Sequence, residues 1–243
     1  MHLLLTRPED PNGDPLGAAL AARGHTITSA PVLRIALTGG LPDLAGAQAL
    51  IVTSQNALRA ISLKPVPDAV KDLVLYAVGP ATADLARALG FRHVVEGPGS
   101  GRELAPLIAA AAVPGRGALA YLTGAQRAFD FAAALGAQGF DVRAHVVYRA
   151  EPMDALPAEV TSGLAEGAFG GVLLMSPRTA RTYVSLVAAA GLAAAAARPA
   201  YFCLSEAVAR DLHPLGAVNA VVARAPNSQE MLALIAREAP DFP

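Results

Sequence analysis

Short apolar runs alternate with longer stretches in which Ala and Leu recur at helical spacing, and this alternation continues along the whole chain. Such alternation is typical of parallel sheets whose strands are connected by helices. Glycines follow several helical stretches and predict helix ends at Gly24, Gly90, Gly139 and Gly216. The pattern therefore predicts an α/β fold. The predicted strands are residues 2–6, 26–29, 49–53, 74–78, 94–95, 119–123, 141–147, 171–175, 200–204 and 220–223.

The order of these elements repeats once. An apolar strand that ends in Thr, then a helix, then a second apolar run occur at the start of the chain and return near its middle. Two further strand ends recur in the same order. The corresponding positions are Thr6 and Thr123, Ser54 and Ser176, and Gly79 and Ser205. A duplicated fold usually forms two lobes with a ligand cleft, so the sequence predicts two similar lobes of parallel sheet flanked by helices.

Two extended apolar segments, 32–37 and 144–151, lack a Ser or Gly at their ends and look like a connecting pair. If both connect the lobes, the chain is interleaved, and two crossing segments would limit lobe motion. A plain duplication is equally compatible with the residues. The interleaved division gives lobe 1 as residues 1–33 plus 152–243 and lobe 2 as residues 36–148, whereas the plain duplication gives 1–113 and 118–243.

Composition indicates an ordinary soluble globular protein, because 53% of the 243 residues are hydrophobic and 16% are charged. A net charge of −1 argues against binding nucleic acid through a global field, so no nucleic-acid partner is expected. The single cysteine, Cys203, cannot form an internal disulfide and is expected to be an inert buried thiol in a reducing compartment.

The apolar run within residues 1–5 is too short for a signal peptide, so a cytoplasmic location is expected. The longest uncharged run, residues 182–197, is shorter than the roughly 18 residues that a membrane span needs and is expected to be an Ala-rich helix. No membrane contact is therefore predicted. Coiled-coil heptads are absent from the sequence, and a monomer is the simpler expectation.

Ligands of open parallel sheets bind beyond the carboxyl ends of the strands, where helix N-termini favour anions. The predicted strand ends carry hydroxyl, amide, glycine and arginine residues, which suit a polyanion. A single Ser or Thr in such a place is more often only a helix cap, but the recurrence in both halves favours a shared binding role. Ser54 and Thr82 could serve as cap and ligand together. The strand-end candidates are Arg7, Ser54, Gln55, Gly79, Thr82, Gly124, Ser176, Arg178 and Ser205.

Several common sites have no counterpart in the sequence. There is no Walker loop, no Gly-x-Ser-x-Gly elbow and no histidine or cysteine cluster at metal spacing. The glycine-rich segment 97–101 lacks the spacing of a dinucleotide fingerprint and is interpreted as a flexible loop. We therefore expect no cofactor and no metal.

Five short motifs occur in an order that resembles the uroporphyrinogen-III synthase family over essentially the whole chain. They are Leu4-Leu5-Thr6-Arg7-Pro8, Val52-Thr53-Ser54-Gln55-Asn56-Ala57, Ala77-Val78-Gly79-Pro80-Ala81-Thr82-Ala83, Val147-Tyr148-Arg149 and Met175-Ser176-Pro177. The resemblance implies two α/β lobes joined by a two-stranded β-ladder, with the first lobe built from both chain ends. It therefore favours the interleaved division.

The resemblance also implies a reaction in tetrapyrrole (haem) biosynthesis. Members of the family cyclise hydroxymethylbilane, a linear tetrapyrrole polycarboxylate, with loss of water and inversion of the last pyrrole ring to give uroporphyrinogen III. Tyr148 matches the family's Val-Tyr segment and would donate a proton or hydrogen bond to the departing hydroxyl; the alternative is an aromatic that only packs in the ladder. The arginines expected to pair with carboxylates are Arg7, Arg127 and Arg178.

One position departs from the family pattern. Where the family's second half commonly has a Gly-Pro-Thr-Thr-type turn, this chain has Ser205 followed by Glu206. The expected threonine hydroxyl is missing there, and a carboxylate stands near a predicted polyanion site. Two alternatives consequently stay open: a two-lobed solute-binding module, and a regulatory or structural homologue that binds without turnover.

Overall fold

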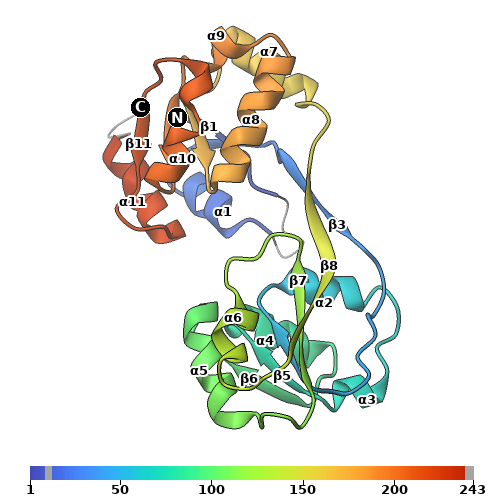
Figure 1. The fold of residues 1–243 in the computed structure, drawn as a ribbon. Helices are drawn as coiled ribbons and strands as arrows, with labels where there is room; N and C mark the ends of the chain where they lie inside the picture. Colours follow the sequence, from blue (N-terminus) through green and yellow to red (C-terminus); the bar gives the residue numbers. More distant parts are fainter. Residues whose placement is uncertain (9–12, 239–243) are drawn as a thin grey trace. The chain divides into compact units, whose positions relative to one another are not determined.

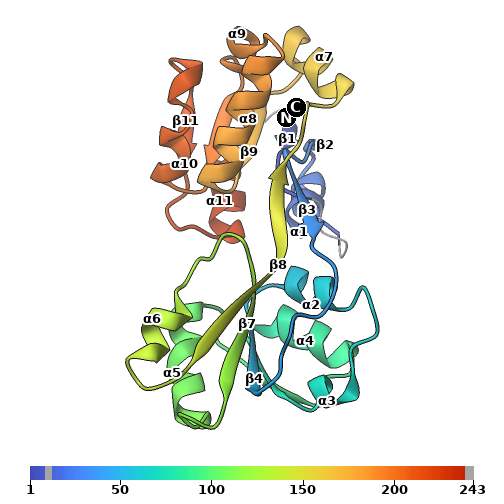
Figure 2. The same ribbon diagram turned by 45° about the vertical axis from the view of Figure 1, so that its right-hand side comes forward.

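The computed structural model describes residues 1–8 and 13–238. The chain divides into two compact units (Figure 1). Unit 1 consists of Met1–Arg34 together with Glu151–Pro243, and unit 2 consists of Ile35–Ala150. Each unit contains a sheet with helices on both faces (Figure 2), and each is described by itself below.

The sheet of unit 1 has the strand order β11-β10-β9-β1-β2, and its neighbouring strands are all parallel. Its strands are β1 (His2–Leu5), β2 (Thr26–Ser29), β9 (Gly171–Leu174), β10 (Ala200–Cys203) and β11 (Ala220–Val222). Its helices are α1 (Pro15–Ala21), α7 (Ala158–Glu166), α8 (Pro177–Ala189), α9 (Ala193–Ala196), α10 (Glu206–Arg210), η1 (His213–Leu215) and α11 (Ser228–Glu238).

Alternate residues of the central strands of unit 1 enter two separate cores. Leu4 packs with residues of α7 and α8 on one face of the sheet, whereas Leu3 and Leu5 pack with residues of α1 and α11 on the other. Both faces are covered, as expected for a parallel sheet, and this explains why the strands read as continuous apolar runs.

The sheet of unit 2 has the order β3-β8-β7-β4-β5-β6. Its strands are β3 (Leu33–Leu37), β4 (Ala47–Val52), β5 (Val74–Ala77), β6 (His93–Glu96), β7 (Ala118–Gly124) and β8 (Val142–Pro152). Its helices are α2 (Gln55–Ile61), α3 (Asp68–Lys71), α4 (Pro80–Ala88), α5 (Gly101–Ala111) and α6 (Phe131–Gly136). Residues of α2 and α4 pack on one face of the sheet and residues of α5 and α6 on the other.

Strand order confirms the predicted repeat. In unit 1, β1 lies between β2 and β9, followed by β10 and β11; in unit 2, β7 lies between β8 and β4, followed by β5 and β6. The corresponding pairs are parallel in both units. The five strands of unit 1 match five of the six strands of unit 2, and β3 has no counterpart among the described strands of unit 1. The strand ends that the sequence paired therefore occupy equivalent places in the two sheets.

Each predicted strand overlaps an observed one. The extended segment 32–37 corresponds to β3, and 144–151 lies within β8, which pairs with β7 as far as Tyr148. The prediction of a single helix over 182–197 is wrong: α8 ends at Ala189, Gly191 adopts a φ of +70°, and the short helix α9 follows. The left-handed backbone at Gly191 stops the first helix.

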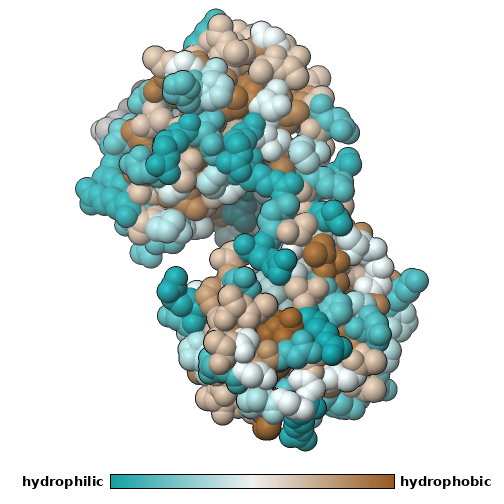
Figure 3. All heavy atoms as spheres, in the orientation of Figure 1, coloured by the Kyte–Doolittle hydropathy of each residue, from teal (hydrophilic) through white to brown (hydrophobic). Residues whose placement is uncertain are grey.

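Hydropathy on the surface is mixed. On the face of each unit that Figure 3 shows, hydrophilic side chains separate small hydrophobic areas. The most exposed large hydrophobic side chain is Leu63, at 58%. Across the part of the chain that the structure describes, no helix combines the length and the apolar character that crossing a membrane requires.

Candidate functional site

The carboxyl ends of three neighbouring parallel strands of unit 2 open onto one cavity of about 450 Å³. Thr53 follows β4, Val78 follows β5, and Thr123 lies at the end of β7. The lining contains hydroxyls, one arginine and no carboxylate, which suits an anionic ligand. The lining residues are Thr53, Val78, Gly99, Ser100, Gly101, Arg102, Tyr121, Thr123, Gln126, Ala128, Phe129 and Tyr148.

Tyr148 lies beside Gly124 at the edge of this cavity. The two residues are partners in the β7–β8 pairing, just after a register shift at Thr123. A Cβ on Gly124 would lie 2.7 Å from two ring carbons of Tyr148 and 2.9 Å from its hydroxyl. Among residues 1–8 and 13–238, the Tyr148 hydroxyl has no hydrogen-bond partner. Gly124 therefore leaves the space in which the Tyr148 ring lies, and the phenol is available to a ligand.

A second tyrosine reaches the same cavity from β7. The hydroxyl of Tyr121 lies 3.1 Å from the hydroxyl of Thr53. The Tyr121 ring is only 3% exposed and packs edge to face on Phe131, with ring centroids 5.0 Å apart. Sequence reasoning missed Tyr121, because a tyrosine inside a fully apolar strand reads as a core residue.

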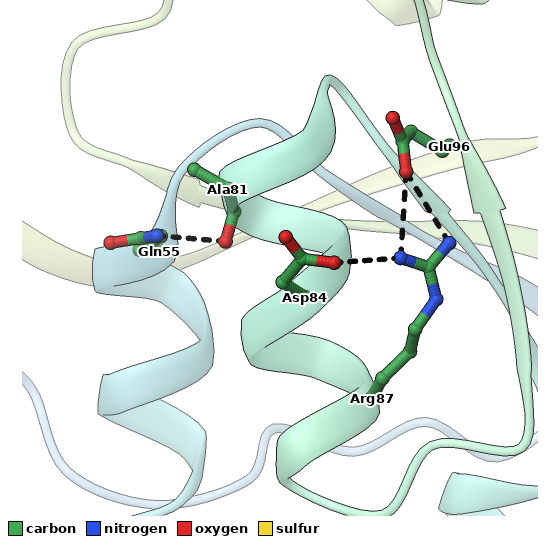
Figure 4. A network of polar contacts seen from close by, with 5 residues as sticks. All are labelled: Gln55, Ala81, Asp84, Arg87 and Glu96. Carbon is green, nitrogen blue, oxygen red and sulfur yellow. Dashed lines mark hydrogen bonds and ion pairs between the residues drawn. The ribbon is translucent and has the colours of Figure 1, made fainter.

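The first turns of α2 and α4 are joined by a side-chain hydrogen bond, which Figure 4 shows. Gln55 donates from Nε2 to the carbonyl oxygen of Ala81 at 2.7 Å. Ser54 caps α2 and accepts a hydrogen bond from the backbone N–H of Asn56 at 3.2 Å. Further along, Arg87 pairs with Asp84 and Glu96, which connects α4 to β6 (Figure 4). These contacts fix the two helix ends, so Ser54 and Gln55 serve local structure here.

The predicted cap role of Thr82 is wrong. Gly79 occupies the N-cap of α4, with Pro80 at the first helical position, so Thr82 is the third residue of the helix. Thr82 is buried, with 6% of its surface exposed. Gly79 lies beside the loop that contains Gly99: a Cβ there would lie 3.5 Å from the Cα of Gly99, which is an ordinary van der Waals contact. Neither Gly79 nor Thr82 is among the residues that line the 450 Å³ cavity.

The loop between β6 and α5, which the sequence pattern left without a function, contributes Gly99 and Ser100 to the cavity, and the start of α5 contributes Gly101 and Arg102. Ser100 caps α5, accepting from the backbone N–H of Glu103 at 3.3 Å and donating to the Glu103 carboxylate at 2.6 Å. A Ser followed three residues later by Glu is the sequence signature of a capping box, and it could have identified this helix start.

Arg127 lies in the loop between β7 and α6. It lines a neighbouring cavity of about 380 Å³ together with Ala128, Phe129 and Asp130. Ala128 and Phe129 also line the first cavity, so the two adjoin. Asp130 is held at the N-cap of α6, where it accepts from the backbone N–H of Ala133 at 3.0 Å.

The candidates of unit 1 lie at the equivalent strand ends. Arg7, after β1, forms an ion pair with Asp14 at 3.4 Å. Ser176 caps α8, with Arg178 in the first turn, and its hydroxyl lies 2.7 Å from that of Thr179. Ser205 is the N-cap residue of α10, where its side chain makes no capping hydrogen bond.

Cys203 is buried at the end of β10. Burial, with a smaller contribution from the negative charge of Glu206, raises the pKa of the thiol to about 12. The thiol is therefore protonated at neutral pH and is a poor nucleophile. Within the described ranges, no three His, Cys, Asp or Glu side chains form a group that could hold a metal ion.

Solved structures with the same fold are uroporphyrinogen-III synthases. The enzyme from Helicobacter pylori 26695 matches with a TM-score of 0.66 at 15% identity, over 98% of this chain and 99% of that one. A mutant enzyme from Thermus thermophilus matches with a TM-score of 0.52 at 16% identity, over 98% of each chain. At these identities the likeness concerns the fold. None of the curated proteins compared with the sequence matches it.

Family assignment comes from the sequence as a whole. The family model described as uroporphyrinogen-III synthase HemD matches residues 14–233, which is most of the chain and includes the strand ends around the cavity. This chain belongs to the uroporphyrinogen-III synthase family.

Proposed function

We propose that the protein is a hydro-lyase that cyclises hydroxymethylbilane to uroporphyrinogen III. Family membership over residues 14–233 carries this proposal. The cavity of unit 2 supports it, because its lining offers hydroxyl donors and an arginine to a polycarboxylate and contains no carboxylate that would repel one. At about 450 Å³ the cavity is in the range of sites for drug-sized ligands, so it would hold one part of the tetrapyrrole rather than all of it.

The reaction needs a proton for the leaving group. The terminal hydroxymethyl group loses its hydroxyl as water, and the electron-rich pyrrole stabilises the resulting azafulvenium cation. The substituted carbon of the last ring then attacks this cation to give a spiro intermediate, which rearranges and loses a proton to yield the inverted ring. We assign the proton donation to the Tyr148 hydroxyl, because it lines the cavity and has no hydrogen-bond partner among the described residues.

Binding is the second task of the protein, since the two end rings must be held so that the bond forms at the substituted carbon. In unit 2 we assign contacts with substrate carboxylates to Arg102, Ser100 and Arg127, which line the two adjoining cavities. The strand-end candidates of unit 1 remain proposed contacts: Arg7, Ser176, Arg178 and Ser205. Ser54 and Gln55 make hydrogen bonds at the starts of α2 and α4, and we propose that they act indirectly, by fixing the helix ends near the site. A contact of Thr82 with the substrate stays a prediction from the sequence.

A monomeric state, a cytoplasmic location and the absence of a nucleic-acid partner stay predictions from the sequence. The division into lobes joined by residues 32–37 and 144–151 likewise stays a proposal. Sedimentation of the purified protein at micromolar concentration tests the predicted monomeric state directly, and the mass of one chain is the expected result.

The function is tested with freshly prepared hydroxymethylbilane. The protein is mixed with this substrate, and the product is oxidised to porphyrin. The type I and type III porphyrin isomers are then separated by chromatography, and a reaction without protein is the control. Protein-dependent type III isomer is the expected result. Type I alone, which is the product of spontaneous closure, would overturn the proposal and favour a homologue that binds without turnover.

A further inference from the structure

The hydroxyl pair of Thr53 and Tyr121 is a buried polar feature of the cavity that the proton transfer does not use. The two oxygens lie 3.1 Å apart, and either could be the donor. Among the described residues neither hydroxyl has another hydrogen-bond partner. Two hydroxyls carry two hydrogens, and their mutual bond consumes one, so the pair retains one donor without an acceptor. Both residues line the cavity, which is where this donor can find its acceptor.

Strand pairing holds the two hydroxyls in place. Ile51 of β4 is the register partner of Tyr121 in β7, and Thr53 lies two residues further along on the same face of the sheet. The Tyr121 ring is 3% exposed and is fixed by Phe131. Thr53 is less buried than Tyr121. The phenol is the more acidic of the two hydroxyls, which favours Tyr121 as the donor to Thr53. In that arrangement the hydrogen of Thr53 is left for a ligand.

The surroundings define the ligand group. The lining of the cavity contains Arg102 and no Asp or Glu. The two acids that directly follow lining residues are engaged in helix caps: Glu103 accepts from the Ser100 hydroxyl, and Asp130 accepts from the backbone N–H of Ala133. An anionic acceptor is favoured at such a place, because a hydrogen bond to a charged group is stronger than one to a neutral group. The substrate of the proposed function carries carboxylates on every pyrrole.

We propose that Thr53 donates a hydrogen bond to a carboxylate of the tetrapyrrole and that Tyr121 is the positioning residue that orients the Thr53 hydroxyl. This inference rests on the proposed function, because it names a contact within the same site. It assigns Thr53 and Tyr121 to the binding of the substrate and leaves proton donation to Tyr148.

The test uses variants that keep the shape of each side chain. Thr53→Val removes the donor, Tyr121→Phe removes its orienting partner, and Thr53→Ser keeps a hydroxyl. Tyr76→Phe is the matched control, since Tyr76 is also 3% exposed in a strand of unit 2 but does not line this cavity. Two quantities are measured on the full chain: the steady-state constants for hydroxymethylbilane, and the Kd for uroporphyrin III, which needs no turnover.

Thr53→Val should raise KM and Kd about tenfold with a smaller change in kcat, as expected for the loss of a hydrogen bond to a charged group. Tyr121→Phe should raise both about threefold, and the double variant should match Thr53→Val because both changes remove one contact. Thr53→Ser should bind more tightly than Thr53→Val, because it keeps a hydroxyl, and Tyr76→Phe should resemble the original protein. If every variant has the same KM and Kd as the original protein, the inference is overturned. Synthesis of the type III isomer by the original protein would still support the proposed function.

The two ideas can also fail separately. If the original protein makes no type III isomer, the proposed function fails. Weaker binding of uroporphyrin III by Thr53→Val than by Thr53→Ser would then still support the contact with a carboxylate. Equal binding by those two variants would overturn it.

Discussion

Equivalent strand ends of the two units use similar residues differently. At the end of β1 in unit 1, Thr6 is 1% exposed and donates to the carbonyl oxygen of Leu173 at 2.7 Å, and the next residue, Arg7, pairs with Asp14. At the end of β7 in unit 2, Thr123 lines the cavity, and the next residue is Gly124, which makes room for the ring of Tyr148. At this pair of strand ends, unit 1 uses the Thr6 hydroxyl and Arg7 in contacts within the unit, whereas unit 2 leaves Thr123 and Tyr148 at the lining of a cavity.

The same contrast holds at the first turns of the helices that follow β5 and β10. In unit 2 the N-cap is Gly79, which lies beside the loop of Gly99 and brings no charge to the first turn. In unit 1 the N-cap is Ser205, and Glu206 brings a negative charge into the first turn. A carboxylate at this place is favourable for the helix and unfavourable for a polyanion, so the two equivalent helix starts differ in how well they suit an anionic ligand.

The largest effect is expected from Tyr148→Phe. The ring would keep its place against Gly124, but the only group that we assign to proton donation would be lost. The kcat for type III synthesis should fall about 100-fold, the lower end for loss of a general acid. KM should change little, and the protein should unfold at an unchanged temperature. A variant with unchanged kcat would show that another group, or solvent, protonates the leaving hydroxyl.

Gly124→Ala tests whether the empty space at the end of β7 matters. The added Cβ would lie 2.7 Å from the Tyr148 ring, so the ring must move. We expect kcat to fall about tenfold, because misplacing a catalytic group weakens catalysis without removing it. Gly136→Ala is the matched control: a Cβ there meets no atom within 4 Å, and alanine is the better helix former. Equal activity of the two variants would contradict the role of Gly124.

Paired threonine variants test the contrast directly. Thr6→Val should lower the free energy of unfolding by about 1–2 kcal/mol, since the carbonyl of Leu173 loses a buried hydrogen bond. Thr123→Val should cost less stability, because among the described residues the only hydrogen-bond partner of its hydroxyl is the adjacent carbonyl oxygen of Gly124, at 3.2 Å. It should instead raise KM about threefold through loss of a polar group at the cavity. Denaturant unfolding and steady-state kinetics measure both effects. The reverse pattern would refute the division between units.

Much of the fold was readable from the sequence. Four-residue apolar strands such as β1 and β9 are buried on both faces, so they appear as unbroken runs between glycines and helix starts. The repeat was also readable, since Thr6 and Thr123 end equivalent strands. Thr82 was misassigned although the sequence contained the correcting signal: Pro80 suits the first position of a helix and places the cap at Gly79.

The missed part of the candidate site depends on tertiary contacts. Ser100 and Arg102 reach the cavity because the loop after β6 returns past the end of β5, which no local pattern specifies. Tyr121 has the sequence context of a core residue, and every residue of β7 is indeed buried. Its position along the strand, close to the carboxyl end, is what brings its hydroxyl to Thr53. The sequence could therefore identify the ends of the strands, but not which residues from other segments lie beside those ends in the folded protein.

The smallest predicted effect concerns a position where the units differ away from the site. His25 of unit 1 and Phe140 of unit 2 are equivalent, because each precedes the second strand of its repeat and donates its backbone N–H to a helix leucine. Phe140 is 6% exposed, whereas His25 has a buried Nδ1 without a partner among the described residues.

Burial, followed by the charges of the N-terminal ammonium and Arg23, lowers the pKa of His25 below 6.5, although a backbone hydrogen bond with Met1 opposes the shift. As the pH falls below about 6.5, the unfolded chain therefore takes up the proton first, and the free energy of unfolding decreases. His25→Phe should reduce this decrease, and His213→Gln, at an exposed histidine of the same unit, should leave it unchanged. Thermal unfolding at pH 5, 6 and 7.5 measures the difference. If stability falls with pH to the same extent in the original protein and in His25→Phe, the buried histidine does not destabilise unit 1 at low pH.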